Sequence, residues 1–139
     1  MDPLIGTKLS NFRIDVLLGE GGMGAVYRAT DLNLARPVAL KLMHRQLAAQ
    51  SQFQRRFMQE AQAVARLSHP SIVTIYGFDN RDGHLYIIME YVQGVSLGKY
   101  IKQLVERRQV VKLNETLTIV AQVADALAYA HRAGVIHRD

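Results

Sequence analysis

The sequence predicts an α+β fold, in which a five-stranded antiparallel sheet with one helix precedes the first helices of an incomplete helical region. Two observations predict the sheet: strand-like alternation flanks a glycine-rich stretch, and two further β-rich runs follow a single amphipathic helical stretch. A third observation predicts the helical region, because the last long helical stretch is apolar almost all round. At 139 residues the chain has the size of one domain or of a part of a larger one.

The composition excludes several classes of protein. Hydrophobic residues make up 49% of the chain and charged residues 21%, which favours a folded domain over intrinsic disorder. The net charge is +5, but the basic residues are scattered, which favours solvated surfaces over nucleic-acid binding. The absence of cysteine excludes disulfides, and the five histidines lack metal-ligand spacing. Neither a signal peptide nor a membrane segment is present in the chain, so we expect a cytoplasmic location.

The first two predicted strands flank the glycine-rich stretch. Residues 12–16 alternate between apolar and polar side chains, and the stretch from 18 to 26 reads LGEGGMGAV. Its glycines Gly19, Gly21 and Gly24 follow the pattern G-x-G-x-x-G, which lets a backbone approach an anion closely. Strand character resumes directly after the third glycine. The order is therefore strand, loop, strand, which disfavours a dinucleotide-binding fold, where a helix follows the loop.

The next two elements each carry one charged residue in an apolar setting. After a connecting turn, the strand over residues 38–43 is predicted to alternate, with Val38, Leu40 and Leu42 on one face and Ala39, Lys41 and Met43 on the other, so that Lys41 lies among apolar neighbours. The helical stretch from 51 to 67 has an apolar stripe, and Glu60 occupies a gap in it. Each charge is costly to bury unless it is paired, so we expect a Lys41–Glu60 ion pair between sheet and helix. The alternative is a lysine that extends its charge to solvent from an edge strand.

Two more strands and two helices complete the predicted elements. The β-rich runs over residues 72–78 and 85–89 are separated by turn-forming residues, which predicts a hairpin. Residues 90–94 form a linker, and Ser96 is a suitable N-cap for the helix that follows. The last helix is predicted over residues 114–133. Because it is apolar almost all round, it belongs in the interior of a larger body.

Four of these motifs together resemble those of the serine/threonine protein kinases, particularly the bacterial branch of that family. They are the glycine-rich loop with Val26, then Val38-Ala39-Leu40-Lys41, then Glu60, then His137-Arg138-Asp139, in the order of the kinase signature. The resemblance extends from about Phe12 to Asp139. It implies an N-terminal extension over residues 1–11, a kinase N-lobe with hinge over 12–92, and an incomplete C-lobe over 93–139.

The resemblance also implies roles for single residues. The glycine loop covers the triphosphate, and Lys41, held by Glu60, contacts the α- and β-phosphates. Asp139 matches the catalytic aspartate that accepts the proton of the substrate hydroxyl. The implied catalytic residues are thus Asp139, Lys41 and Glu60, and no residue of the chain is implied as a metal ligand.

The adenine is expected between apolar side chains, with Met89 as the gatekeeper behind it and the backbone of Glu90 and Val92 as its hinge partners. The full implied ATP-binding set is Leu18, Gly19, Glu20, Gly21, Gly22, Met23, Gly24, Ala25, Val26, Ala39, Lys41, Met89, Glu90 and Val92.

The implied function is ATP-dependent phosphoryl transfer to serine or threonine of protein substrates. The Mg²⁺ ligands of the family follow the catalytic aspartate, so we expect this chain to be an ATP-binding fragment that is inactive alone. The alternatives are a catalytically silent nucleotide-binding or scaffolding module, and an unrelated nucleotide-binding fold. The apolar last helix leads us to expect dimerisation or aggregation of the isolated chain. A membrane anchor beyond residue 139 is compatible with all of these interpretations.

Overall fold

The computed structural model describes residues 2–137, which divide into two compact units. The first contains residues up to Ser68 together with Val73–Tyr91. The second contains His69–Ile72 and the chain from Val92 onward. The segment His69–Ile72 therefore belongs to the second unit although first-unit residues flank it on both sides. The predicted order of a sheet followed by helices is confirmed. Among the described residues, all strands lie in the first unit, and the second unit contains helices.

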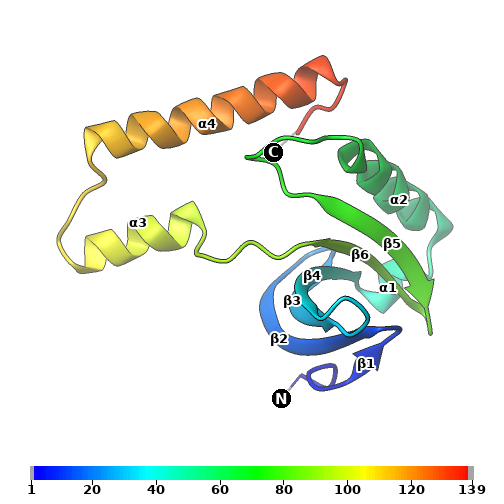
Figure 1. Ribbon diagram of the computed structural model, residues 1–139. Helices are drawn as coiled ribbons and strands as arrows, with labels where there is room; N and C mark the ends of the chain where they lie inside the picture. Colours follow the sequence, from blue (N-terminus) through cyan, green and yellow to red (C-terminus); the bar gives the residue numbers. More distant parts are fainter. Residues whose placement is uncertain (1, 138–139) are drawn as a thin grey trace. The chain divides into compact units, whose positions relative to one another are not determined.

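Within the described residues, six antiparallel strands form one curled sheet in the first unit (Figure 1). They are β1 (Lys8–Leu9), β2 (Phe12–Gly21), β3 (Gly24–Asp31), β4 (Arg36–Met43), β5 (Ile75–Arg81) and β6 (His84–Glu90), in the spatial order β1-β2-β3-β4-β6-β5. The sequence predicts five of them. The additional strand, β1, has only two residues, too few to show a period, and it pairs with the start of β2 through a turn in which Ser10 has a φ of 54°.

The two faces of this sheet support separate apolar clusters, as the alternation of side chains along a strand requires. In the strand 38–43, Val38, Leu40 and Leu42 enter one cluster and Met43 enters the other, so the predicted alternation is confirmed. The larger cluster consists of Leu9, Phe12, Ile14, Ala25, Tyr27, Ala29, Val38, Leu40, Leu42 and Tyr86. The second consists of Met43, Ala48, Phe57, Ala61, Leu85 and Ile87.

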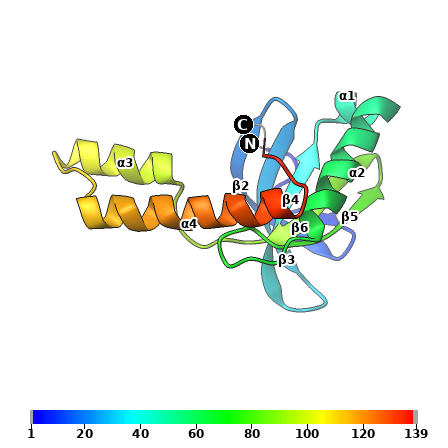
Figure 2. The ribbon, with the colours of Figure 1, turned by 90° about the horizontal axis from the view of Figure 1, so that it is seen from above.

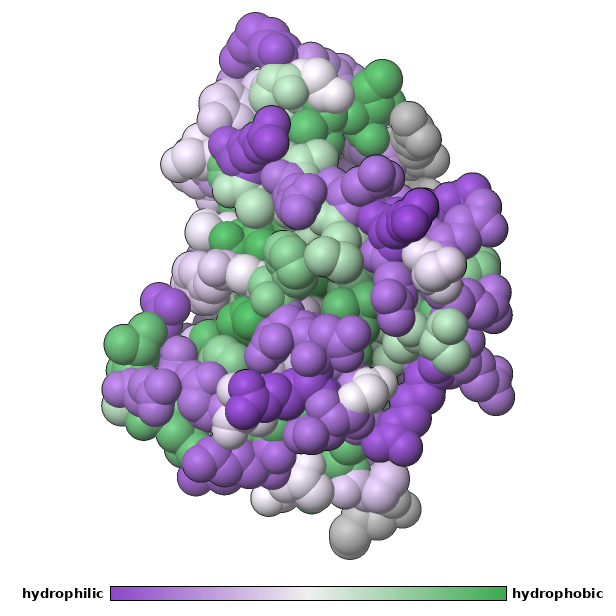
Figure 3. All heavy atoms as spheres, turned by 90° about the vertical axis from the view of Figure 1, so that its right-hand side faces the viewer, coloured by the Kyte–Doolittle hydropathy of each residue, from purple (hydrophilic) through white to green (hydrophobic). Residues whose placement is uncertain are grey.

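Two helices follow β4, the short α1 (Arg45–Ala48) and the longer α2 (Ser51–Ala65), which matches the predicted helical stretch. Helix α2 contributes Phe57 and Ala61 to the second cluster, one helical turn apart. From the side of Figure 1 on which α2 and β5 lie, the surface is largely hydrophilic, with hydrophobic atoms visible in smaller patches (Figure 3). Helix α2 itself is amphipathic, because Phe57 and Ala61 are buried whereas Arg55 and Arg56 are exposed.

Strands β5 and β6 form the predicted hairpin. Its turn is Asp82-Gly83, with φ values of 53° and 75°, and Arg81 pairs with His84 across it. Positive φ at both central residues is the geometry of a type I′ turn, which Asp-Gly favours. Strand β5 begins at Ile75 rather than at residue 72, because residues 69–72 form a turn closed by a 3.1 Å hydrogen bond from the Ile72 amide to the His69 carbonyl.

The second unit contains two helices, α3 (Leu97–Glu106) and α4 (Leu113–Arg132), which lie side by side in both ribbon views (Figures 1 and 2). The Ser96 side chain accepts a hydrogen bond from the Lys99 amide, which confirms the predicted N-cap. Between the helices, the Tyr100 hydroxyl donates to a Glu115 carboxylate oxygen at 2.7 Å. No helix of the described residues has the length and apolar character required to cross a lipid bilayer.

Helix α4 is less buried than the sequence predicts. Among its described residues only Ala126 and Ala130 are buried, while Val120 and Val123 remain more than half exposed. Its neighbours within the unit, α3 and the segment 69–72, are too few to cover a helix that is apolar on nearly every side. The segment is nevertheless fixed to α4, because His69 Nε2 lies 2.9 Å from Asp125 Oδ2.

Candidate functional site

The glycine-rich stretch forms the tip of the β2–β3 hairpin. The last paired residues are Gly21 and Gly24, and Gly22 and Met23 make the turn. The predicted order of strand, loop and strand is confirmed, since the chain continues into β3 and not into a helix. A register irregularity between Leu17 and Gly19 leaves Leu18 without a direct partner, and its side chain is exposed.

The glycines of this hairpin differ in what surrounds them. A Cβ atom built on Gly19, Gly21 or Gly22 would meet nothing within 4 Å, whereas one built on Gly24 would overlap the carbonyl oxygen of Leu42 on β4. None of the four has a positive φ. Gly24 is therefore required by the close contact of β3 with β4. The other glycines leave open space beside the backbone, which is the room that a bound group needs.

His44, the residue after β4, holds the tip of the hairpin. Its Nε2 donates to the Gly21 carbonyl at 2.9 Å, and its backbone amide donates to the Met23 carbonyl at 3.1 Å. The ring nitrogen that donates must carry the hydrogen, which fixes the tautomer of a neutral imidazole. Sequence reasoning missed this residue, because no spacing rule connects His44 to the glycines that it contacts.

One face of the sheet brings four of the candidate residues together. Val26, Lys41 and Ile87 are direct partners across β3, β4 and β6, and the neighbouring row contains Ala39 and Met89. Directly paired residues of antiparallel strands project on the same side, as do residues two positions apart. Lys41 thus stands among apolar residues on this face. The edge-strand alternative is wrong, because β4 lies between β3 and β6.

The expected ion pair between Lys41 and Glu60 is absent. Among the described residues neither side chain has an ion partner within 4.0 Å, and Glu60 is exposed on α2. The buried stripe of α2 passes through Phe57 and Ala61, and Glu60 projects about 100° away from Ala61 around the helix axis. Ala61, and not Glu60, fills the gap in the predicted stripe, because a buried alanine continues an apolar stripe that larger side chains alone leave open.

The end of β6 contributes Met89 and Glu90. The Glu90 amide donates to the Thr74 carbonyl at 2.8 Å, and a Glu90 carboxylate oxygen accepts from the Thr74 amide at 3.1 Å. Next to it, the Tyr91 ring lies 5.5 Å from the guanidinium of Arg28, a cation–π contact that the sequence did not indicate. These contacts fix the strand end at which the first unit leads to Val92.

Several other predicted site residues are not part of this face. Glu20 and Ala25 are cross-strand partners in the glycine hairpin, and Ala25 enters the core cluster on the opposite face. Val92 belongs to the second unit and is exposed. Asp139 and its neighbour Arg138 lie outside the described residues. Within the described residues, no group of three or more histidine, aspartate or glutamate side chains is arranged to hold a metal ion.

Comparison with known proteins identifies this arrangement. The family model for the protein kinase domain matches residues 12–139. The chain belongs to the protein kinase family. Its matches within the family include bacterial serine/threonine-protein kinases, which confirms the resemblance to that branch. The kinase-like α+β fold is confirmed as well, by the solved structure described next.

The relatives are longer than this kinase-family chain. PksC of Streptomyces coelicolor is 42% identical over 132 residues, which are 92% of this chain and 24% of PksC. PrkC of Bacillus subtilis is 40% identical over 98% of this chain and 20% of its own length. The crystal structure of the Mycobacterium tuberculosis PknI kinase domain has a TM-score of 0.79 and 35% identity, covering 96% of this chain and 53% of that domain. The chain thus spans about a quarter or less of the length of PksC and PrkC.

Proposed function

We propose that this chain provides the ATP-binding part of a serine/threonine protein kinase that transfers the γ-phosphoryl group of ATP to protein substrates. The observation that carries the proposal is the shared face on which Val26, Ala39, Lys41 and Met89 converge from three strands. The relatives, which are serine/threonine-protein kinases by name, support the same chemistry. The domain limits proposed for it are an extension over residues 1–11, an N-lobe with hinge over 12–92 and C-lobe helices from 93.

The proposed nucleotide position follows from the chemistry of this face. Phosphate oxygens take the space beside Gly19 and Gly21, where no side chain intervenes, and the Lys41 ammonium neutralises part of their charge. The adenine takes the apolar surface of Val26 and Ala39, behind which Met89 limits the depth. Because the Glu90 amide is already bonded to Thr74, the Glu90 carbonyl is the hinge group that we assign to the adenine edge, together with the backbone of Val92.

The proposal also accounts for the absence of an ion pair between Lys41 and Glu60. Holding Lys41 against the phosphates requires a carboxylate beside it, and Glu60 is the candidate on α2. With Glu60 exposed, the described arrangement is one in which α2 has not brought that carboxylate to the lysine. We assign the paired arrangement to the nucleotide-bound protein. Mg²⁺ would neutralise part of the phosphate charge, and the family signature places its ligands after the catalytic aspartate, so we assign no described residue to it.

The test of the proposal compares two lysine substitutions in a titration with a fluorescent ATP analogue. Lys41→Met removes the charge at the proposed phosphates, so we expect the dissociation constant to rise at least tenfold, about 1.4 kcal/mol or more. Lys8→Met removes an exposed charge on β1 and serves as the control, with an unchanged dissociation constant expected. Circular dichroism checks that both variants fold. Equal binding by Lys41→Met and the unmodified chain would refute the assignment.

A phosphoryl-transfer assay separates a kinase from the silent-module alternative. Because the 139-residue chain is expected to be inactive alone, the full-length protein that contains it is incubated with ATP labelled at the γ-phosphate and a mixture of serine- and threonine-containing peptides. Labelled peptide that is lost with Asp139→Asn, while nucleotide binding persists, supports a kinase, because Asp139 is proposed to act on the hydroxyl and not on the adenine. Nucleotide binding without any label transfer supports the binding or scaffolding module.

A further inference from the structure

A cavity of about 500 Å³ opens on the face of the sheet opposite Lys41. Its apolar lining includes Leu4, Ala25, Tyr27 and Leu42, of which the last three belong to the larger core cluster. Residues of that cluster alternate along β3 and β4 with those that carry the proposed nucleotide site. Most of the cavity therefore lies on the opposite side of the sheet from Lys41, although Met43, which also lines it, belongs to the cluster on the Lys41 side.

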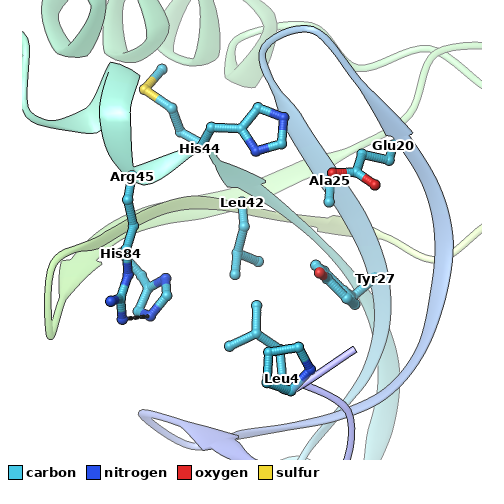
Figure 4. Close-up of a pocket in the computed structure, with 10 residues that line it drawn as sticks. Leu4, Glu20, Ala25, Tyr27, Leu42, His44, Arg45 and His84 are labelled. Carbon is cyan, nitrogen blue, oxygen red and sulfur yellow. Dashed lines mark hydrogen bonds between the residues drawn. The ribbon is translucent and has the colours of Figure 1, made fainter. Parts of the chain in front are cut away.

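One side of the cavity carries an unneutralised positive charge. Arg45, the first residue of α1, directs Nη2 to Nε2 of His84 at 2.9 Å, and Figure 4 shows the two side chains together at the cavity edge. A guanidinium can only donate, so His84 Nε2 accepts and the neutral ring carries its hydrogen on Nδ1. Burial, and next the charge of Arg45, lower the pKa of His84, which agrees with a neutral ring. Among the described residues no carboxylate lies within 4.0 Å of Arg45.

We propose that this cavity is a second ligand site, which binds a small apolar molecule through a carboxylate group placed on Arg45. The planar fork of a guanidinium matches the two oxygens of a carboxylate, and the apolar lining suits the remainder of such a molecule. The volume lies within the range of small-molecule sites, about 300–1,000 Å³. Glu20, on the opposite side of the cavity in Figure 4, repels a carboxylate there and so favours the orientation toward Arg45.

The cavity also adjoins the glycine hairpin. Glu20 and Ala25, which line it, are paired across that hairpin, and His44, another lining residue, holds the carbonyls of Gly21 and Met23. A ligand in the cavity therefore contacts the residues that position the hairpin tip. If the proposed function holds, this contact couples the two sites. Occupancy of the cavity then changes the affinity for nucleotide, and bound nucleotide changes the affinity for the cavity ligand by the same factor.

The first experiment tests the site alone, without nucleotide. The 139-residue chain is titrated with 3-phenylpropanoate and, separately, with 3-phenylpropanamide, which has nearly the same shape without the charge. We expect 1:1 binding of the carboxylate by calorimetry and at least tenfold weaker binding of the amide. Arg45→Gln should weaken carboxylate binding at least tenfold and bring the two probes to equal affinity.

Matched variants identify where the probe binds. Arg55→Gln, an exposed arginine on α2 that does not line the cavity, should bind the carboxylate as the unmodified chain does. Lys41→Met should also bind it normally. No measurable binding at millimolar concentrations, equal losses in Arg45→Gln and Arg55→Gln, or loss in Lys41→Met would each overturn the proposal, the last by placing the probe at the nucleotide face.

The second experiment tests the coupling. The dissociation constant of the fluorescent ATP analogue is measured with and without saturating 3-phenylpropanoate, and we expect a change of at least threefold. In His44→Ala, the probe should still bind while that change disappears, because the contact with the Gly21 carbonyl is lost. An unchanged constant in the unmodified chain would overturn the coupling. Failure of the chain to bind nucleotide at all would overturn the proposed function, and the site would still be judged by the first experiment.

Discussion

At the scale of single residues, the three spaced glycines perform different tasks that their spacing does not distinguish. Gly24 lies against the Leu42 carbonyl, whereas Gly19 and Gly21 border open space. The sequence predicts the hairpin and the lysine that shares its neighbourhood, because strand alternation and motif order are local properties. It does not predict His44 at the hairpin tip, because that contact joins residues 23 positions apart through the fold.

The difference between the glycines can be measured as stability. Gly24→Ala forces a methyl group onto the backbone of β4, so we expect the free energy of unfolding to fall by about 1–3 kcal/mol. Gly22→Ala, in the same hairpin but with nothing within 4 Å of the added carbon, should change it by less than about 0.5 kcal/mol. Urea unfolding followed by circular dichroism gives both values. Equal losses in the two variants would contradict the assigned contact.

At the scale of elements, β4 and α2 show what pattern reading captures and where it fails. The predicted alternation of residues 38–43 is correct because successive side chains of a strand can project to only two sides, and six residues are enough to show which side is apolar. The face of α2 is set by a stripe that includes a small residue, Ala61, and an error of one position turns a helix by about 100°. For this reason Glu60, which was expected on the buried face of α2, lies on its exposed side.

The pairing of β5 with β6 predicts a defined alkaline transition. Tyr86 of β6 is fully buried and its hydroxyl donates to Asp79 Oδ2 of β5 at 3.1 Å. Burial, followed by the hydrogen bond to Asp79, raises the pKa of Tyr86 from 10.0 to about 12. Between these values the unfolded chain loses the phenolic proton and the folded chain keeps it. The free energy of unfolding should therefore fall as the pH rises from 10 toward 12, by on the order of 2–3 kcal/mol for this group.

Tyr86→Phe supplies the control for that transition. The variant cannot titrate at this position, so its unfolding free energy should decline less steeply between pH 10 and 12, while at pH 7 it should be about 1 kcal/mol less stable through loss of the hydrogen bond. Urea unfolding at a series of pH values measures both. Parallel pH profiles for the two proteins would show that Tyr86 is not the group responsible.

At the scale of the whole molecule, the two units differ in how well they cover their apolar residues. The first has two clusters on the two faces of one sheet, whereas the second leaves a series of large apolar side chains exposed on α3 and α4. The apolar composition of α4 predicts that it needs a larger covering body, and within the described residues most of its large apolar side chains are exposed. Patches of this kind favour association.

We therefore expect the 139-residue chain to self-associate in a concentration-dependent manner. Sedimentation velocity should show a rising average mass between about 5 and 200 μM, and the double variant Val120→Gln, Val123→Gln should reduce it, because both side chains are more than half exposed on α4. Thr116→Gln, an exposed polar replacement on the same helix, is the control and should associate as the unmodified chain does. A monomer at every concentration would contradict this expectation.

The segment His69–Ile72 has a practical consequence for dissecting the protein. Its residues interrupt the first unit in sequence but belong to the second, where His69 meets Asp125 on α4. A truncation after Tyr91 would keep these four residues and discard the helix that holds them, so it would not yield a cleanly separated lobe. In such a truncated lobe His69 would lack its partner Asp125. We therefore expect an excised lobe to fold more cleanly if a short hydrophilic connector replaces His69–Ile72.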